Sequence, residues 1–115
     1  MIRAFHYTDI EAQPVEGCAG VSIRWVMAQN VGAPHFAMRI LELEPGASTE
    51  YHAHDWEHQV FVLAGECAVR DAQGNLTAVG PGSCVYVPPE QVHQFLNQGE
   101  TPLRFICVIP FTPQE

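Results

Sequence analysis

Nine prolines and nine glycines divide this 115-residue chain into short runs, and this division is the strongest constraint on its fold. The runs between these residues are rich in valine, isoleucine, phenylalanine and tyrosine, and several alternate between apolar and polar positions. No run carries the periodicity of an amphipathic helix of three turns. Short alternating runs separated by turn residues are typical of an all-β sandwich or barrel.

The alternation predicts about ten short strands. They are expected at residues 3–8, 21–28, 35–44, 49–54, 57–65, 66–71, 76–80, 83–87, 91–97 and 102–110. Residues 9–20 are expected to form a loop, and Pro45-Gly46 and Pro81-Gly82 are expected to form turns. A chain of this length forms one domain, here 1–115. Closing or doubling such a sheet removes its exposed edges, as in a jelly roll.

Composition narrows the function. The formal net charge of −8 argues against nucleic acid and anionic membrane surfaces as partners, because both select basic patches. No apolar run is long enough to span a membrane, and the N-terminus lacks the basic start and apolar stretch of a signal peptide, so a cytoplasmic location is expected. The four cysteines form no C-x-x-C pair and are expected to be free thiols.

Three closely spaced histidines dominate the middle of the chain. His52 and His54 share a face if their segment is extended. His58 lies in the following strand and shares its face with Val60 and Val62. A chain reversal at residues 55–56 would lay these two strands side by side, so that the three imidazoles converge. His93 lies in a later strand-like run and is expected to complete the cluster. Neutral imidazole is a common transition-metal ligand.

A structural role without a metal is the alternative for any single histidine, and it is the interpretation for His6 and His35. For the H-x-H-x-x-x-H pattern it is disfavoured, because burying three unpartnered imidazoles together would cost several kcal/mol. The spacing therefore predicts a metal site at His52, His54, His58 and His93.

Two motifs resemble those of the cupin family. The first, G-x5-H-x-H-x3,4-E-x6-G, is matched in spacing by Gly46, His52, His54, His58 and Gly65. The second, G-x5-P-x-G-x2-H-x3-N, is matched in spacing by Gly82, Pro88, Glu90, His93 and Asn97. The resemblance implies an all-β jelly-roll barrel, the double-stranded β-helix of the cupins, with the metal inside.

The chain departs from these motifs at two positions. His58 stands where the family usually has a glutamate ligand, and the adjacent Glu57 is expected to point away from the cavity by strand parity. Glu90 stands at a turn glycine, a change expected to affect loop shape rather than chemistry. The stretch around the histidines resembles small bacterial cupins with four histidine ligands, which implies one divalent transition metal with manganese as first choice. Ligand type alone suits iron, nickel, copper or zinc equally well.

Four further residues are candidates for the pocket wall. Strand parity and the resemblance place Phe95, Phe105 and Cys107 on the cavity face, although core packing explains each of them equally well. Cys107 is not expected to be a nucleophile, because no base or helix N-terminus is evident beside it. Arg39 interrupts an apolar strand, and it either reaches solvent or, as the resemblance implies, lines the pocket and binds a carboxylate.

Two further residues, Glu50 and Trp56, lie beside the histidines in the sequence. Trp56 is expected either to cover the mouth of the site or to pack on the surface. Glu50 shares a face with the histidines, but its position at the strand start is expected to leave it solvated.

The function expected from these features is a metal-dependent oxidoreductase of the dioxygenase type. Its substrate would be a small apolar or aromatic molecule, with or without a carboxylate. The alternatives are a cupin that binds a small molecule without reaction, and a metal-dependent isomerase or lyase. A homodimer is expected, paired through an edge strand at residues 2–8.

Overall fold

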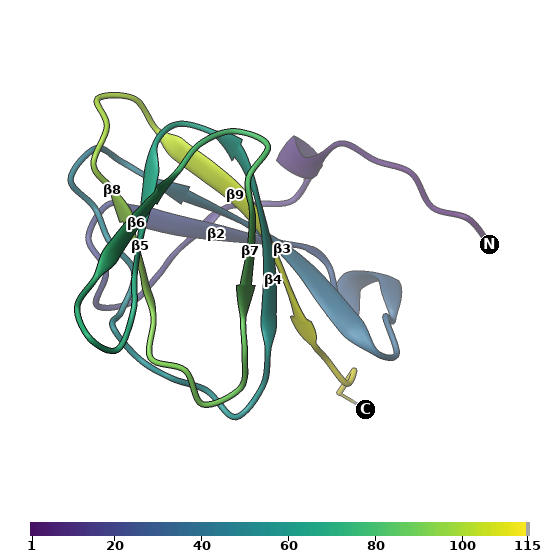
Figure 1. Ribbon diagram of the computed structural model, residues 1–115. Helices are drawn as coiled ribbons and strands as arrows, with labels where there is room; N and C mark the ends of the chain where they lie inside the picture. The colour runs from purple at the N-terminus through teal and green to yellow at the C-terminus, as the bar shows by residue number, and fades with distance from the viewer. Residues whose placement is uncertain (115) are drawn as a thin grey trace.

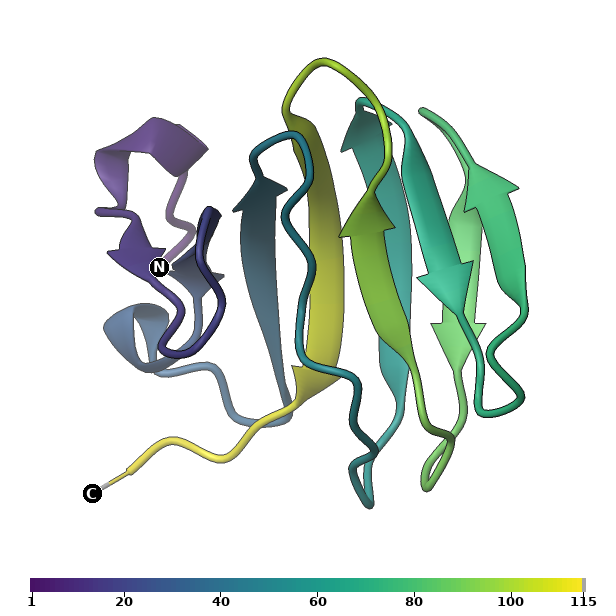
Figure 2. The same ribbon diagram turned by 90° about the vertical axis from the view of Figure 1, so that its left-hand side faces the viewer.

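Two antiparallel sheets contain most of the regular structure of the computed structural model, which describes residues 1–114. The larger sheet has the order β1 (Gln13–Pro14), β2 (Val21–Met27), β3 (Phe36–Leu43), β9 (Leu103–Pro110), β4 (His58–Ala64), β7 (Cys84–Val87). The smaller sheet has the order β6 (Leu76–Val79), β5 (Cys67–Arg70), β8 (Gln94–Asn97). Figure 1 shows the smaller sheet facing β4 and β7 of the larger one, and Figure 2 shows the same barrel from the side. The all-β barrel expected from the sequence is confirmed.

Strand alternation decides which side chains enter the barrel. Along β4 the side chains at 58, 60 and 62 are buried, and those between them are exposed. Along β9 the odd-numbered side chains from Leu103 to Ile109 are buried, and Phe105 and Leu103 are almost fully enclosed. Val62 of β4 pairs with Phe105 of β9, so the two strands present one continuous apolar wall. This is the period of two that the sequence predicts.

The segment after the Pro45-Gly46 turn differs from the prediction. Residues 49–54 form no strand, and the chain from Ser48 to His52 makes only isolated bridges, Ser48 to Leu96 and His52 to His93. The segment therefore lies beside β8, whereas β4 is flanked by β7 and β9, so the predicted pairing of 49–54 with 57–65 is wrong. The reversal does occur, but it carries the chain from one sheet across to the other.

The N-terminus also differs from the prediction, because residues 3–8 form no strand. The chain instead makes a single turn of 3₁₀ helix, η1 (Tyr7–Asp9), in which the His6 imidazole accepts a bond from the Thr8 amide and Asp9 accepts one from the His6 amide. This local pairing competes with a strand ladder. The first residues run outward from the barrel (Figure 1), and Ile2 is 96% exposed.

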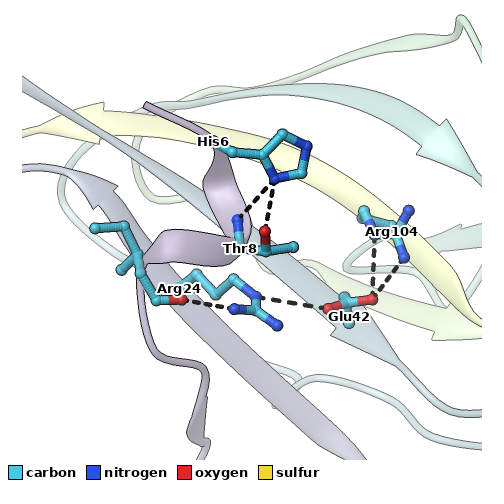
Figure 3. Close-up of polar contacts among 6 residues, drawn as sticks. His6, Thr8, Arg24, Glu42 and Arg104 are labelled. Atoms are coloured by element: carbon cyan, nitrogen blue, oxygen red, sulfur yellow. Dashed lines mark hydrogen bonds and ion pairs between the residues drawn. The ribbon is translucent and has the colours of Figure 1, made fainter. Parts of the chain in front are cut away.

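A polar cluster holds this turn against the larger sheet (Figure 3). The Arg24 guanidinium donates to the Ile10 carbonyl at 2.6 Å, and it lies over the Tyr7 ring. Glu42 accepts from Arg104 through two bonds of 2.9 and 3.1 Å and also faces Arg24 at 3.8 Å. The described chain contains a second short 3₁₀ helix, η2 (Gln29–Val31), but no helix long and apolar enough to cross a membrane. The four cysteines are free, as predicted.

One motif glycine is fixed by close packing. Gly65 has φ of 88°, and a Cβ at this position would lie 2.5 Å from the Pro102 carbonyl oxygen. Asn97, which ends the second motif, is 2% exposed and donates to the carbonyls of Leu43 and Thr101, both at 2.9 Å. Both residues therefore have structural roles: they close the barrel at the end of β4 and β8.

Candidate metal centre

Main-chain pairing brings the two histidine segments together. The His52 amide donates to the His93 carbonyl at 3.2 Å, and the His93 amide donates to the His52 carbonyl at 2.9 Å. The Glu90 amide donates to the His54 carbonyl at 2.6 Å. The backbone of the second motif thus holds that of the first, and His58 enters from β4 on the opposite side.

The four imidazoles converge at the end of the barrel. Five ring-centroid distances lie between 4.2 Å, for His52 and His54, and 6.1 Å, for His54 and His93. His58 lies 4.8 Å from His93 and 5.2 Å from His54. Imidazoles bound side by side on one ion would have centroids about 4.5–5.5 Å apart, given a metal–nitrogen distance of about 2.1 Å. Three of the five distances fall in this range, so the rings are gathered near the spacing that a shared ion requires.

The ring nitrogens have different partners. Nδ1 of His52 lies 3.2 Å from a Glu50 carboxylate oxygen, and Nδ1 of His93 lies 2.9 Å from the Gln91 carbonyl oxygen. His58 is 4% exposed, and its Nδ1 is buried without a hydrogen-bond partner. An unpaired buried nitrogen is costly unless a ligand completes its surroundings.

Burial disfavours the protonated form of these imidazoles. It lowers the pKa of His58 to about 3, and the neighbouring positive charges act in the same direction. Burial also lowers the pKa of His54 and of His93 below the ordinary value. All three are therefore neutral near pH 7 and present lone pairs, which is the state that a metal ion needs.

These observations fit a divalent transition metal. The ring nitrogens lie close together but are not yet oriented toward one common point. Within residues 1–114, no three histidine, cysteine, aspartate or glutamate side chains are disposed as a finished coordination sphere. The His54 ring is stacked on Trp56 at 4.3 Å and 6°, so binding would require the imidazoles to turn. The metal and its four ligands stay predictions.

A cavity of about 150 Å³ adjoins the histidines, and every predicted pocket residue lines it. The set comprises His52, His54, His58, His93, Arg39, Phe95, Phe105 and Cys107. Strands β3, β8 and β9 contribute to its wall through the side chains that point into the barrel. The structure therefore brings together the residues that the sequence singled out, and their chemical roles stay predictions.

Arg39 supplies the positive charge of this cavity. One of its terminal nitrogens donates to the Cys107 thiol at 2.9 Å, and its guanidinium lies over the Trp25 ring at 5.3 Å. Its Nε is buried without a hydrogen-bond partner. Burial raises the pKa of Cys107 despite this arginine, which keeps the thiol protonated and argues against a nucleophilic role.

Sequence reasoning missed one wall of the cavity. The loop that precedes β2 folds over it and contributes Val15, Glu16 and Cys18. The loop is held by backbone bonds from Val15 to Val21 and from Cys18 to Val15. No pattern in residues 9–20 indicated this contact. Glu50 was expected to be solvated, and it is 73% exposed, yet it also lines the cavity.

The other residues near the motif lie outside the cavity. Glu57 points away, as parity predicted, and it accepts a bond of 2.6 Å from the Tyr86 hydroxyl. Trp56 is 39% exposed and packs on the outer side of His54 rather than lining the cavity. His6 caps the N-terminal turn, and the exposed His35 accepts from the Phe111 amide through its backbone.

The family model of the cupin domain matches residues 39–109, more than half of the chain. The chain belongs to the cupin family. The match includes the four histidines and all four predicted pocket residues, so most of the cavity lining lies within the matched segment.

Similar proteins within this family have different functions. The polyketide cyclase RemF from Streptomyces resistomycificus has a structure with a TM-score of 0.89 and 32% identity, covering 96% of this cupin and 80% of that chain. A sugar phosphate isomerase of the cupin superfamily from Silicibacter pomeroyi gives 0.81 and 25%, covering 96% and 77%. An oxalate-binding protein from Thermotoga maritima is 30% identical over 70 residues, 60% of this chain and 57% of that protein. The match thus spans little more than half the length of this curated relative.

Proposed function

We propose that this cupin is a metal-dependent enzyme, an oxidoreductase of the dioxygenase type that acts on a small apolar or aromatic carboxylate. One observation carries the proposal: four imidazoles and one arginine share a small cavity whose remaining wall is largely apolar. Imidazoles alone leave the full double charge of a bound ion uncompensated, unlike a set with a carboxylate.

The four histidines would hold the ion, with manganese as first choice and iron, nickel, copper or zinc as alternatives. A divalent transition metal there would supply Lewis-acid chemistry and, when it is redox-active, electron transfer with dioxygen. Neutral His58 and His93 are buried at the inner side, so they would bind without first losing a proton near pH 7.

The size of the cavity limits the substrate. A volume of about 150 Å³ corresponds to about five water molecules, at about 30 Å³ each. The enclosed part of a ligand is therefore no larger than a short-chain acid or a single ring. A fused polycyclic ligand would extend out past the histidines.

Arg39 and the two phenylalanines would orient this ligand. Arg39 lines the cavity, and a guanidinium pairs with a carboxylate through parallel bonds. Phe95 and Phe105 lie 4.9 Å apart between ring centroids and form the apolar side of the cavity. A carboxylate at Arg39 with its hydrocarbon part on these rings would leave the reacting atoms near the imidazoles.

A second candidate is a reaction without oxidation, in which the ion polarises a carbonyl for cyclisation or isomerisation. The likeness to a polyketide cyclase at 32% identity favours it. Binding without reaction is the third candidate, and the partial likeness to an oxalate-binding protein favours it.

One experiment separates the three candidates. Protein stripped of metal is reloaded with manganese, iron, copper or zinc, and it is then mixed with small aromatic and enolisable carboxylates. The proposal expects oxygen uptake with at least one redox-active metal and none with zinc. Product formation with zinc under nitrogen would identify the non-redox enzyme, and tight binding without product in mass spectra would identify the binding protein. Absence of turnover with every metal would refute an enzymatic function.

The role of Arg39 has its own matched control. Arg39→Gln should raise KM for a carboxylate substrate but not for its neutral amide, because only the former uses the guanidinium charge. Arg70→Gln changes an arginine that lies over Tyr51, outside the cavity, and should leave both KM values unchanged.

A further inference from the structure

We infer that Glu50 is a positioning residue that fixes the proton of His52 on Nδ1 and so prepares Nε2 of this imidazole for metal binding. The inference rests on the proposed metal site. It assigns a role to a residue whose sequence position indicated only solvation.

The argument begins with the donor and acceptor capacities of the two groups. A carboxylate only accepts hydrogen bonds, and a neutral imidazole carries its single proton on one of its two nitrogens. The 3.2 Å contact between a Glu50 oxygen and Nδ1 of His52 is therefore satisfied when the proton is on Nδ1. The Nε2 atom then carries the lone pair.

His93 has the same arrangement with a different acceptor. Its Nδ1 lies 2.9 Å from the Gln91 carbonyl oxygen, which also only accepts. His52 and His93 are backbone-paired neighbours, and both acceptors assign Nδ1 as the protonated atom. Two adjacent imidazoles thus share one tautomer, set once by a side chain and once by the main chain.

The other two imidazoles have no such acceptor in the described part of the chain. Nδ1 of His58 is buried without a partner, and the ring of His54 is oriented by its stacking on Trp56. Glu50 is accordingly the side chain that hydrogen-bonds to an imidazole of this cluster within residues 1–114. Acceptors of this kind orient metal-binding histidines and increase their basicity.

The position of Glu50 makes the role testable without disturbing the core. Its side chain is 73% exposed, so its removal leaves little packing unsatisfied. Loss of an outer carboxylate weakens metal binding by about 10- to 100-fold, and the lower end is expected here because solvent screens this carboxylate.

The first test uses metal-free protein. Nitrogen-15 NMR of the imidazoles at pH 8 should show His52 with its proton on Nδ1, and Glu50→Ala should convert it to a mixture of tautomers. A proton on Nε2 of His52 in the unsubstituted protein would overturn the inference.

The second test measures zinc and manganese affinity by competition with a chelator. Glu50→Ala should weaken binding about tenfold, whereas Glu50→Gln should weaken it less because an amide oxygen still accepts from Nδ1. Glu57→Ala is the matched control, because this glutamate bonds to Tyr86 outside the cavity. Thermal unfolding of the metal-free variants should be unchanged.

Equal affinity in Glu50→Ala and Glu57→Ala would overturn the inference, as would the absence of any metal binding by the unsubstituted protein. Neither readout depends on turnover. A protein that binds metal through His52 but catalyses nothing would refute the proposed function and leave the role of Glu50 intact.

Discussion

Replacing Glu90 with glycine is expected to stabilise the protein, although the change removes a side chain. Glu90 has φ of 68°, and within residues 1–114 it is the one non-glycine residue with positive φ. This conformation costs an L-amino acid about 1–2 kcal/mol, whereas glycine adopts it freely. The Glu90 side chain is exposed, so its loss removes little packing. The cupin motif has glycine at this position, and the strain gives the physical reason.

The expected gain is smaller than the strain itself. Glycine has more freedom in the unfolded chain, which offsets about 0.4–1 kcal/mol. A net stabilisation of about 0.5–1 kcal/mol remains, which corresponds to an increase of about 2–5 °C in Tm for a chain of this size. The bond from the amide of residue 90 to the His54 carbonyl belongs to the backbone, so metal affinity should not change.

Urea unfolding, followed by tryptophan fluorescence, measures the effect. The protein is kept metal-free with a chelator, because a bound ion would shift the midpoint by mass action. Glu100→Gly is the matched control, since Glu100 is exposed and has no positive φ; it should lose about 0.4–1 kcal/mol. Glu90→Val should be less stable than the unsubstituted protein, because a β-branched residue tolerates positive φ poorly. Equal losses in Glu90→Gly and Glu100→Gly would refute the reasoning.

Three further predictions concern the metal, pH and assembly. His54→Ala should sharply lower metal occupancy by elemental analysis while His6→Ala should not, and equal occupancy would contradict the ligand assignment. Metal affinity should fall as acid protonates the ligands, and because burial lowers the pKa of His54, His58 and His93, this fall should lie below the ordinary imidazole value of about 6.5. The pKa of His58 is lowered to about 3 in the folded protein, whereas it is about 6.5 in the unfolded chain. Between these two pH values the unfolded chain binds more protons than the folded protein does. The urea midpoint of metal-free protein should therefore fall as the pH drops through this range, and it should fall less in His58→Asn. Light scattering should give twice the chain mass if the exposed segment 2–8 is exchanged between two copies, and a monomer mass would exclude the homodimer.

Strand parity made the inward faces predictable. Knowing that His58 faces inward was sufficient to place Val60 and Val62 beside it and to turn Glu57 away, because side chains alternate strictly along an unbroken strand. The same rule placed Phe105 and Cys107 on one face of β9. The motif spacing then identified which inward residues share the cavity.

Strand parity did not predict the structure correctly where the chain is extended but forms no regular hydrogen-bonded pairing with a neighbouring strand. Residues 49–54 alternate like a strand, yet they form no ladder: Thr49 hydrogen-bonds to Gln94 and Phe95 of β8, and His52 makes an isolated bridge to His93. Their partner depends on a crossing between sheets that no local pattern encodes. The loop before β2 is the second failure. Its contribution to the cavity, through Val15 and Cys18, depends on tertiary packing and backbone bonds. Alternation in the sequence identifies site residues that lie on regular strands. It does not identify residues that enter the site from loops or from extended segments outside a sheet.

The site itself is assembled mainly by such backbone. The reciprocal bonds between His52 and His93, together with the bond from Glu90 to His54, tie one motif to the other without any side chain. The imidazoles are consequently held close by the backbone that carries them. The His54 ring is stacked on Trp56, which is 39% exposed, so this imidazole would have to turn to bind an ion. An ion would bind rings that the backbone already holds close, so its affinity should depend on ring orientation, the property that we assign to Glu50 at His52.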